Sequence, residues 1–481
     1  MTYNTIHNSG KPSTDQIIGV LVGQAVGDAL GATYEFGPSS AFSQTFECDA
    51  DVEMRGGGSF AWGVGEFTDD TQMAVILAES IVYNGAFDEN DVFSRWSRWA
   101  KTARDVGGTT MKALSQPDLR RSREVMRSSG GNGCGAVMRV GPVGLMPLSD
   151  TTTEWVARSQ GLITHPDSRT VESAVIAALL VKRLIGMDQP PRLSEDLYDI
   201  VDDIIVQHVS LDMSAWAASH FSRTADVAGN NFEGHHCLAQ AIRAVALSDS
   251  YLGAIRGAID MGGDADSVAA VAGAIAGAMY GVSGIPARLA TKVHGYIPEA
   301  HGNKMRRIGL EDLYALASNV AERGWRKRSP DYGGVVKPVF LWRCADTDFY
   351  ASNLAGAATV DPDEFGVISL CRTFGELDHI NDRVQFYLVD SPQPESNPNL
   401  EVVVEDIMNE VSKMMCRKKK ILIHCHAGVS RTGFVAKLVA MEWLNLTHSE
   451  AHDRLFGIYH RYQMSNPAFT EYLSEKFGDV S

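Results

Sequence analysis

The sequence predicts a multidomain protein, in which an all-α domain is followed by an α/β domain with a central, mostly parallel sheet. With 481 residues, the chain is too long for one ordinary core, so two or three domains are expected. Up to residue 322, apolar residues recur at three- and four-residue spacing, which indicates amphipathic helices. Beyond Arg323, apolar strand-like runs alternate with helical patterns, which favours a parallel sheet covered by helices.

Six helical segments support the prediction for the first domain, and Gly-rich loops such as 55–58 and 130–133 separate them. The segments are Gln16–Leu30, Thr71–Tyr83, Val171–Ile185, Leu197–Val209, His236–Ala246 and Ser267–Tyr280. The uncharged stretch 267–287 is rich in Ala and Gly rather than Leu and Ile. It therefore predicts a tightly packed internal helix and not a membrane span. One all-α domain is expected over residues 14–325.

A basic, turn-rich stretch marks the predicted boundary, and residues 326–334 are expected to form a linker. The second domain is predicted over residues 335–478, where expected strands alternate with expected helices. The strands are Val335–Trp342, Phe365–Leu370, Val384–Val389 and Lys420–His424, and the helices are Val402–Met415 and Gly433–Leu446.

Charge and cysteine content exclude several classes of protein. A net charge of −16 and a pI near 5.3 argue against a non-specific binder of nucleic acid or of anionic membranes. The seven cysteines are scattered without a CxxC pair, which predicts thiols in a reducing compartment and no structural zinc site. The polar residues 1–13 lack the apolar core of a signal peptide. We therefore expect a cytoplasmic protein with no nucleic-acid or membrane partner.

Two motifs place carboxylates and hydroxyls at the starts of predicted helices. They are Thr68-Asp69-Asp70 and Asp264-Ala265-Asp266-Ser267. Helix capping explains either motif alone, but four carboxylates packed into one site would need a cation to be tolerated. Oxygen ligands favour Mg²⁺ or Mn²⁺ over zinc. Two such ions could polarise a substrate oxygen and activate a water molecule.

Three further segments fit a substrate site. Glu35 and Asp105 are carboxylates next to glycines, although surface carboxylates are the alternative interpretation for both. The loop 130–139 offers backbone N–H groups and Arg139 to a pyrophosphate. Most Gly-rich loops are simply turns, so this loop alone is weak evidence for a phosphate site.

The order of these segments resembles the ADP-ribosylglycohydrolase family, of the dinitrogenase-reductase-activating type, over about residues 14–325. The resemblance implies an all-α fold, two Mg²⁺ or Mn²⁺ ions, and hydrolysis of the bond between ADP-ribose and a protein side chain, with arginine favoured. Its transition state should resemble an oxocarbenium ion. Ser267 stands where the family usually has threonine and keeps the hydroxyl group.

The same resemblance implies roles for individual residues. Six of them would be metal ligands: Thr68, Asp69, Asp70, Asp264, Asp266 and Ser267. Glu35 would act at the metals or as an acid–base group, and Asp105 matches a carboxylate that some members use in catalysis. Gly131, Asn132 and Gly135 would contact the phosphates, and His165 would line the same pocket.

The second domain carries the pattern His-Cys-x5-Arg, in which an apolar strand ends at His424-Cys425 and a helix starts near Arg431. Five intervening residues let the loop, which contains Gly428, curl so that its N–H groups point at a phosphate. The helix N-terminus adds positive potential, and Arg431 can bind two phosphate oxygens. Cys425 is then expected to be a thiolate nucleophile.

Two more residues complete this predicted site. Ser430 is expected to hydrogen-bond the sulfur of Cys425. Asp390 lies 35 residues before Cys425 at the end of a predicted strand, which suits a general acid on a loop over the site. A strand-end turn residue is the alternative interpretation of Asp390.

This second constellation resembles the dual-specificity protein phosphatases over about residues 335–478. The resemblance implies hydrolysis of a phosphomonoester on a protein or a small molecule. The leading hypothesis is a bifunctional enzyme that removes ADP-ribose and phosphate from modified proteins. Two alternatives remain open. Both sites could act on small-molecule ADP-ribose derivatives, or the first domain could bind an ADP-ribosyltransferase as an immunity-type partner.

Overall fold

The computed structural model describes residues 12–187, 194–299, 304–322, 334–393, 396–462 and 466–477. The chain divides into two compact units, Met1–Ile285 with Lys292–Arg326 and Pro286–Thr291 with Lys327–Ser481. The predicted linker lies outside the described residues except for Gly334. Within the described ranges, none of the helices combines the length and the hydropathy that a membrane crossing requires.

The first unit is helical, and each of the six predicted segments corresponds to one of its helices. In chain order the helices are α1 (Thr14–Gly31), α2 (Ala41–Thr45), α3 (Asp69–Asn84), α4 (Glu89–Trp99), α5 (Gly108–Leu114), α6 (Leu119–Met126), α7 (Gly135–Met138), α8 (Gly141–Leu145), α9 (Asp150–Gly161), α10 (Ser168–Ile185), α11 (Ser194–His208), α12 (Ser214–His220), α13 (Gly234–Ala246), α14 (Tyr251–Ile259), α15 (Ala265–Tyr280) and α17 (Leu310–Glu322). An antiparallel hairpin of β1 (His294–Pro298) and β2 (Met305–Gly309), which the sequence did not predict, precedes α17.

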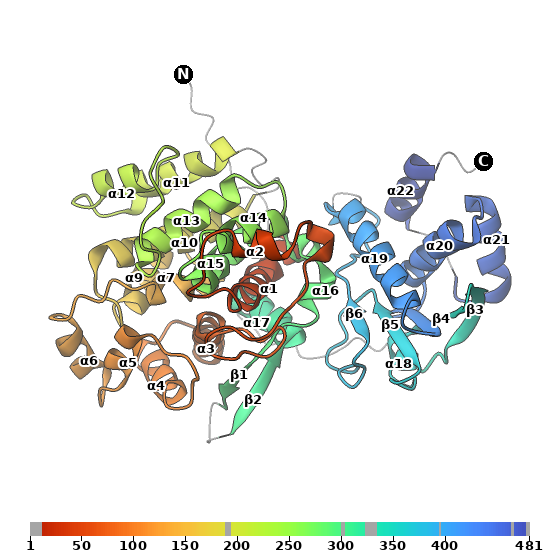
Figure 1. Cartoon of the computed structure of the whole chain (residues 1–481), viewed down its shortest axis with the longest axis horizontal. Helices are drawn as coiled ribbons and strands as arrows, with labels where there is room; N and C mark the ends of the chain where they lie inside the picture. The colour runs from red at the N-terminus through yellow and green to blue at the C-terminus, as the bar shows by residue number, and fades with distance from the viewer. Residues whose placement is uncertain are drawn as a thin grey trace. The chain divides into compact units, whose positions relative to one another are not determined.

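Helices α1 and α15 lie side by side in the middle of this unit (Figure 1). Gly19, Gly23 and Gly27 recur every fourth residue and form one face of α1. A Cβ atom on Gly23 would lie 2.3 Å from the carbonyl oxygen of Gly273, and one on Gly19 would lie 2.2 Å from that of Gly277. The backbones therefore touch, and the C-terminal end of α1 meets the N-terminal end of α15.

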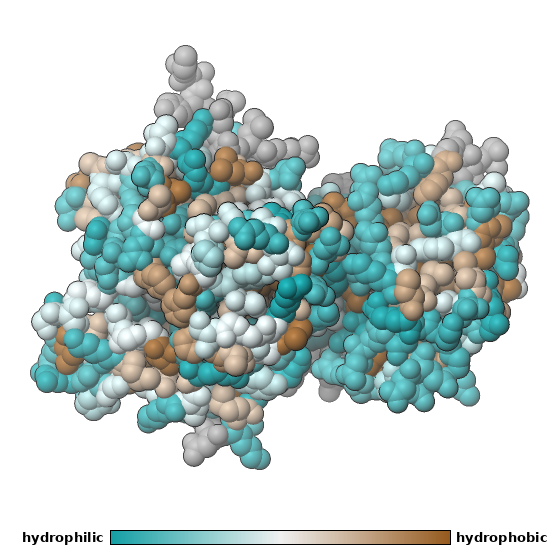
Figure 2. All heavy atoms as spheres, viewed as in Figure 1, coloured by the Kyte–Doolittle hydropathy of each residue, from teal (hydrophilic) through white to brown (hydrophobic). Residues whose placement is uncertain are grey.

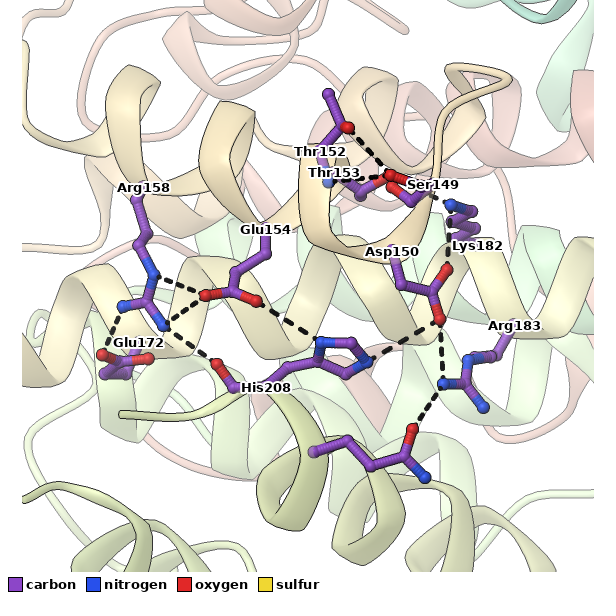
Figure 3. Close-up of polar contacts among 11 residues, drawn as sticks. Ser149, Asp150, Thr152, Thr153, Glu154, Arg158, Glu172, Lys182, Arg183 and His208 are labelled. Carbon is purple, nitrogen blue, oxygen red and sulfur yellow. Dashed lines mark hydrogen bonds and ion pairs between the residues drawn. The ribbon is translucent and has the colours of Figure 1, made fainter. Parts of the chain in front are cut away.

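A charged network connects α9, α10 and α11 (Figure 3). Arg158 pairs with Glu172 and donates a hydrogen bond to the carbonyl oxygen of His208 at 3.0 Å. Asp150 pairs with Lys182 at 2.9 Å. Because Glu172 is only 3% exposed, its charge is tolerated only with a partner such as Arg158. The network thus fixes the packing of these three helices.

The second unit contains a five-stranded sheet in the order β3-β4-β7-β5-β6. Its strands are β3 (Val339–Cys344), β4 (Thr347–Asn353), β5 (Phe365–Ser369), β6 (Arg383–Gln385) and β7 (Lys420–Cys425), and its helices are α16 (Ala287–Ala290), α18 (Leu354–Ala357), α19 (Leu400–Met415), α20 (Ser430–Leu444), α21 (His448–Ile458) and α22 (Pro467–Phe477). Only the pairing of β3 with β4 is antiparallel. This mixed sheet agrees with the predicted α/β class.

Strand β7 occupies the centre of the sheet, between β4 and β5. All of its residues after Lys420 are buried, as expected for a strand covered on both faces. The sequence did not predict β4, and β6 is shorter than the predicted strand Val384–Val389. Hydrophilic side chains cover most of the face of this unit that Figure 2 shows.

Candidate functional site

A cavity of about 250 Å³ opens in the first unit where the N-terminal ends of α3 and α15 converge. Nine residues that the sequence singled out line it: Glu35, Asp69, Asp70, Asp105, Gly135, His165, Asp264, Asp266 and Ser267. Six of these nine are carboxylates. Helix α1 contacts α15, and the start of α3 lies beside them. Acidic residues from four segments of the chain are thereby brought into one cavity.

Asp28, near the end of α1, fixes the start of α3. One of its carboxylate oxygens accepts a hydrogen bond from the backbone N–H of Thr68 at 2.9 Å. The hydroxyl of Thr68 donates to Asp70 Oδ2 at 3.1 Å. Thr68 is fully buried and does not line the cavity. Its hydroxyl group therefore orients a carboxylate of the cavity wall.

Among the described residues, two groups of three carboxylates are close enough to hold a cation each. The first contains Asp28, Asp70 and Asp266, and the second contains Glu35, Asp264 and Asp266. Within each group, one oxygen atom from every residue lies within 4.8 Å of the others. Asp266 belongs to both groups, so it would bridge two ions. Hard oxygen ligands of this kind suit Mg²⁺ or Mn²⁺.

The protonation of these groups supports a cation site. Burial, and then the neighbouring carboxylates, raise the pKa of Asp70 and of Asp266 well above the ordinary value. The same causes raise the pKa of Glu35 to about 8. Among the described residues, Asp70 Oδ1, Asp266 Oδ1 and Glu35 Oε2 have no hydrogen-bond partner. A divalent cation would satisfy these oxygens and favour their ionised form.

Asp69 lines the cavity without belonging to either group. Burial first, and then Asp70, raise its pKa well above the ordinary value. A cation in the cavity would therefore also favour the ionised form of the Asp69 carboxylate.

The Gly-rich loop contributes part of its length to the cavity. His165 is buried and packs against Gly135, where a Cβ atom would lie 2.4 Å from the imidazole Cε1. Burial, and then Arg139, lower the pKa of His165 to about 3, so the ring is neutral. Gly131 and Asn132 do not line the cavity in this conformation.

Arg139 corrects one expectation, because it does not face a phosphate site. Its side chain is completely buried. The guanidinium donates hydrogen bonds to the side chain and the backbone carbonyl of Gln160, both at 2.9 Å, and to the hydroxyl of Thr164 at 2.8 Å. It also lies 4.0 Å from the ring centroid of Trp96. Arg139 therefore braces the helices behind the loop.

Several residues of this site, among them Asp28, Phe36, Cys134 and Phe232, were not among the predicted site residues. Asp28 belongs to one carboxylate group, and its position between Gly27 and Gly31 was the signal for it. Cys134 lines the cavity and lies 3.0 Å from Asp264 Oδ2. Phe232 stacks on Phe36, with their ring centroids 5.7 Å apart, and both residues line the cavity. Nothing in the sequence indicated this pair.

The second site begins at Cys425, the last residue of the central strand β7. The carboxyl end of a central parallel strand is where ligands bind in α/β sheets. Cys425 is 2% exposed, and the hydroxyl of Thr432 donates to its sulfur at 3.1 Å. The predicted hydrogen bond from Ser430 is absent, because the Ser430 hydroxyl has no partner among the described residues. Thr432, two residues into α20 from Ser430, takes that role.

The side chains of Arg431 and Asp390 lie close together. The Nη1 atom of Arg431 donates to the carbonyl oxygens of Leu370 and Leu388 at 3.1 and 3.0 Å. Its Nε atom lies 3.7 Å from Asp390 Oδ2. Asn466 donates to the other oxygen of Asp390 at 2.9 Å. The segments after β5 and β6 thus orient the arginine, and α22 begins beside the aspartate.

Residues of β4 and of the segment after α21 hold the loop between Cys425 and α20 in place. Gly428 has a φ of +68°, and a Cβ atom there would lie 2.6 Å from the carbonyl oxygen of Ser352, so only glycine fits. The hydroxyl of Tyr459 donates to Gly428 O at 2.6 Å, and Arg461 donates to Ala427 O at 2.7 Å. A loop fixed in this way is a suitable cradle for an anion.

The fold and the acidic cavity of the first unit define a class of hydrolase. Residues 10–329 match the family ADP-ribosylglycohydrolase, and the chain belongs to this family. It is 27% identical to the ADP-ribosyl-(dinitrogen reductase) glycohydrolase of Rhodospirillum rubrum, over 59% of this chain and 92% of that protein. It is 30% identical to the ADP-ribosylarginine hydrolase Tri1 of Pseudomonas putida strain GB-1, over 58% of this chain and 74% of that protein.

One solved structure gives the same assignment. An ADP-ribosylglycohydrolase-related protein complex aligns with 64% of this chain and 98% of its own, with a TM-score of 0.50 and 27% identity. A leucine rich repeat and phosphatase domain containing protein from Entamoeba histolytica aligns with 30% of this chain at a TM-score of 0.23 and 14% identity. That second likeness is too small to support an assignment of the second unit.

Proposed function

We propose that the chain is a bifunctional hydrolase. Residues 14–325 remove ADP-ribose from a modified protein side chain with two divalent cations, Mg²⁺ or Mn²⁺. Residues 335–478 hydrolyse phosphomonoesters through a cysteine nucleophile, and residues 326–334 link the two parts. Arginine is the favoured acceptor of ADP-ribose, because a relative at 30% identity is an ADP-ribosylarginine hydrolase.

The observation that carries the first activity is the convergence of two carboxylate groups on Asp266. Divalent ions held there would orient the ribose and supply Lewis acidity. The carboxylates that line the cavity also act by themselves. Positive charge develops on the ribose ring as its bond to the side chain breaks. A cavity wall built of carboxylates stabilises that charge.

Glu35 and Asp105 are the proposed acid–base groups. Both lie in the cavity wall and are only partly buried, so a water molecule can reach them. Burial, followed by Asp264, raises the pKa of Asp105 to about 6, which suits a proton acceptor near neutral pH. One of these carboxylates takes a proton from the water that attacks the anomeric carbon. The side chain of the modified protein leaves as its bond to the ribose breaks.

The rim of the cavity offers a surface for the nucleobase. Phe36 and Phe232 are stacked, with an interplanar angle of 15°, and are 56% and 41% exposed. Exposed parallel rings of this kind suit a planar aromatic ligand. Gly135 and His165 line the same cavity as the carboxylates, and the proposed substrate has its nucleobase at the two rings and its ribose at the carboxylates.

A substrate panel tests the first activity. Full-length protein is incubated with Mg²⁺ or Mn²⁺ and with arginine-ADP-ribosylated protein, serine-ADP-ribosylated protein or small-molecule ADP-ribose derivatives, and free ADP-ribose is measured. Release from the arginine-linked substrate supports the proposal. Turnover of the small molecules alone would favour the small-molecule alternative. If the variant Asp69→Ala plus Asp70→Ala protected targets from an ADP-ribosyltransferase as well as wild type does, the first domain would be a binding module.

The observation that carries the second activity is the joint position of Thr432, Cys425 and Arg431 at the carboxyl end of β7. The sulfur of Cys425 attacks phosphorus and forms a sulfur–phosphorus bond as the bond to the leaving oxygen breaks. Asp390 gives its proton to that oxygen. Water then attacks phosphorus, Asp390 takes a proton back, and the thiolate is released. Arg431 binds the phosphate oxygens with its nitrogens other than Nη1.

Hydrolysis of para-nitrophenyl phosphate tests this activity. Cys425→Ser should abolish turnover. Cys416→Ser, which changes an exposed cysteine of the same unit, should leave it unchanged. Loss in neither variant would show that Cys425 is not the nucleophile. If Cys425→Ser alone loses activity, the rates for phosphotyrosine, phosphoserine and small phosphomonoesters would define the substrate class.

A further inference from the structure

Three histidines of the first unit form a cluster that the acidic cavity does not include. His220 ends α12, and His235 and His236 lie in the first turn of α13. One ring nitrogen of each lies within 4.8 Å of those of the other two. Their ring centroids are 4.9 Å apart for His220 and His235, 5.0 Å for His220 and His236, and 4.3 Å for His235 and His236.

Two ring nitrogens of this cluster are free to bind a metal. The Nδ1 atoms of His235 and His236 are buried and have no hydrogen-bond partner among the described residues. His235 is 3% exposed, so water does not replace the missing partner readily. An unpaired buried polar atom is costly, and two of them side by side indicate a common ligand.

The opposite nitrogens are held in place. His235 Nε2 lies 3.6 Å from Glu233 Oε2. His220 Nε2 lies 3.2 Å from the carbonyl oxygen of His235. Because a carbonyl oxygen only accepts, His220 Nε2 carries the proton and His220 Nδ1 keeps its lone pair. Metal-ligating histidines are typically oriented in this way, by a carboxylate or carbonyl on the nitrogen away from the metal.

We propose that His220, His235 and His236 bind one transition-metal ion of the Zn²⁺ class, at a site distinct from the carboxylate cavity. Imidazole ligands favour such borderline ions over Mg²⁺. A tetrahedral zinc ion brings ligand nitrogens to about 3.3 Å from one another, so binding would draw the three rings closer together. Water or a small anion completes the coordination. The absence of a CxxC pair predicted no structural zinc site, and the proposal departs from that prediction because its ligands are histidines and not cysteines.

The position of the site gives it a structural role. The backbone N–H of Gly234 donates to Asn132 O at 2.9 Å, and that of Cys134 donates to Phe232 O at 3.1 Å. The start of α13 is therefore bonded to the Gly-rich loop beside the cavity. An ion that joins α12 to α13 fixes this wall, including Phe232. It takes no part in bond cleavage.

Metal content tests the proposal in the full-length chain without a histidine tag. Chelator-treated protein is equilibrated with Zn²⁺ in a large excess of Mg²⁺, passed through a desalting column and analysed for zinc. The background variant Asp69→Asn plus Asp70→Asn weakens the carboxylate site. His220→Gln and His236→Gln are made in that background, with His379→Gln as the control because His379 is an exposed histidine of the other unit.

The background variant and the His379→Gln control should retain one zinc ion per chain, and the two cluster variants none. Glu233→Gln should weaken zinc binding by roughly 10–100-fold. Co²⁺ should give the visible absorption of tetrahedral nitrogen ligation in the wild type, a readout that does not depend on the variants folding. Zinc retention by the cluster variants, or absence of zinc and of the cobalt spectrum in the wild type, would overturn the proposal.

Discussion

The Asp28 carboxylate accepts two hydrogen bonds from Thr71, one from its backbone N–H at 3.0 Å and one from its hydroxyl at 2.6 Å. This contact joins the last turn of α1 to the first turn of α3. Asp28 also belongs to a candidate metal group with Asp70 and Asp266. One side chain therefore positions a helix start and offers an oxygen to a cation.

Replacing Asp28 with asparagine should weaken metal binding and ADP-ribose release together. The amide removes one negative charge and one acceptor, so we expect roughly 10–100-fold weaker Mn²⁺ affinity. Titration calorimetry of metal-free protein measures it. Asp15→Asn is the matched control, because Asp15 is a buried carboxylate at the other end of α1 that holds Ser283. An equal loss in both variants would show only a general effect of buried charge.

The glycine contact of α1 with α15 should be intolerant of a methyl group. In Gly23→Ala, a Cβ atom 2.3 Å from Gly273 O must push the helices apart, at a cost of about 3 kcal/mol. Mn²⁺ should raise the unfolding temperature of the first unit, which identifies its transition in a thermal scan. In Gly23→Ala this transition should shift to lower temperature. Gly257→Ala is the control, since its Cβ would meet Ala244 Cβ at an ordinary 3.5 Å and alanine favours helix. Equal stability of the two variants would disprove the close contact.

Metal-free protein should lose stability as pH rises. Burial and neighbouring carboxylates raise the pKa of Glu35 to about 8, and burial raises that of Asp28 to about 6. The folded state therefore binds more protons than the unfolded state. The contribution of Glu35 and Asp28 to the free energy of unfolding is fully present below their ordinary pKa values of 4.5 and 3.8. It is lost as pH rises through their folded-state pKa values.

Thermal unfolding between pH 5 and about 8 measures this effect. Mn²⁺ favours the ionised carboxylates, so the stabilisation it gives should grow with pH. Glu35→Gln should flatten the decline of the metal-free protein in the upper half of this range. A metal-free protein whose stability rises with pH across the range would contradict the raised pKa values.

Thr432 and Ser430 should differ in their effect on the phosphatase. The Thr432 hydroxyl donates to the Cys425 sulfur, and a hydrogen bond to an ionised group contributes about 1.5–3 kcal/mol. Thr432→Val should therefore lower kcat for para-nitrophenyl phosphate by roughly 10–100-fold. Ser430→Ala, which removes a hydroxyl without a described partner, should have a small effect. The reverse order would restore the role expected for Ser430.

Local patterns predicted the elements better than they predicted contacts. The period of apolar residues found α1, α3 and α15, because each carries its own helical signal. Strand β4, whose pairing with the central strand β7 is a long-range contact, was missed. The hairpin β1–β2 was missed as well. Short strands depend on their partners more than on their own sequence.

The chemistry of the sites was predictable by residue type and less so by geometry. The motifs that contain Asp70 and Asp266 indicated carboxylate clusters, but the sharing of Asp266 follows from the glycine contact between two distant helices. Arg139 was expected at a phosphate and is instead buried behind the loop. Which hydroxyl meets Cys425 depends on the rotation of α20, and a motif does not specify that rotation.

Whether the chain holds two independent hydrolases is tested by the release of free ADP-ribose from an arginine-ADP-ribosylated protein by the full-length chain with Mn²⁺. Wild type and Cys425→Ser should release it at the same rate, whereas Asp69→Ala plus Asp70→Ala should release none while keeping its phosphatase activity. Equal release by the wild type and the double variant would contradict a carboxylate-held metal site. Loss in Cys425→Ser would contradict two independent hydrolases in one chain.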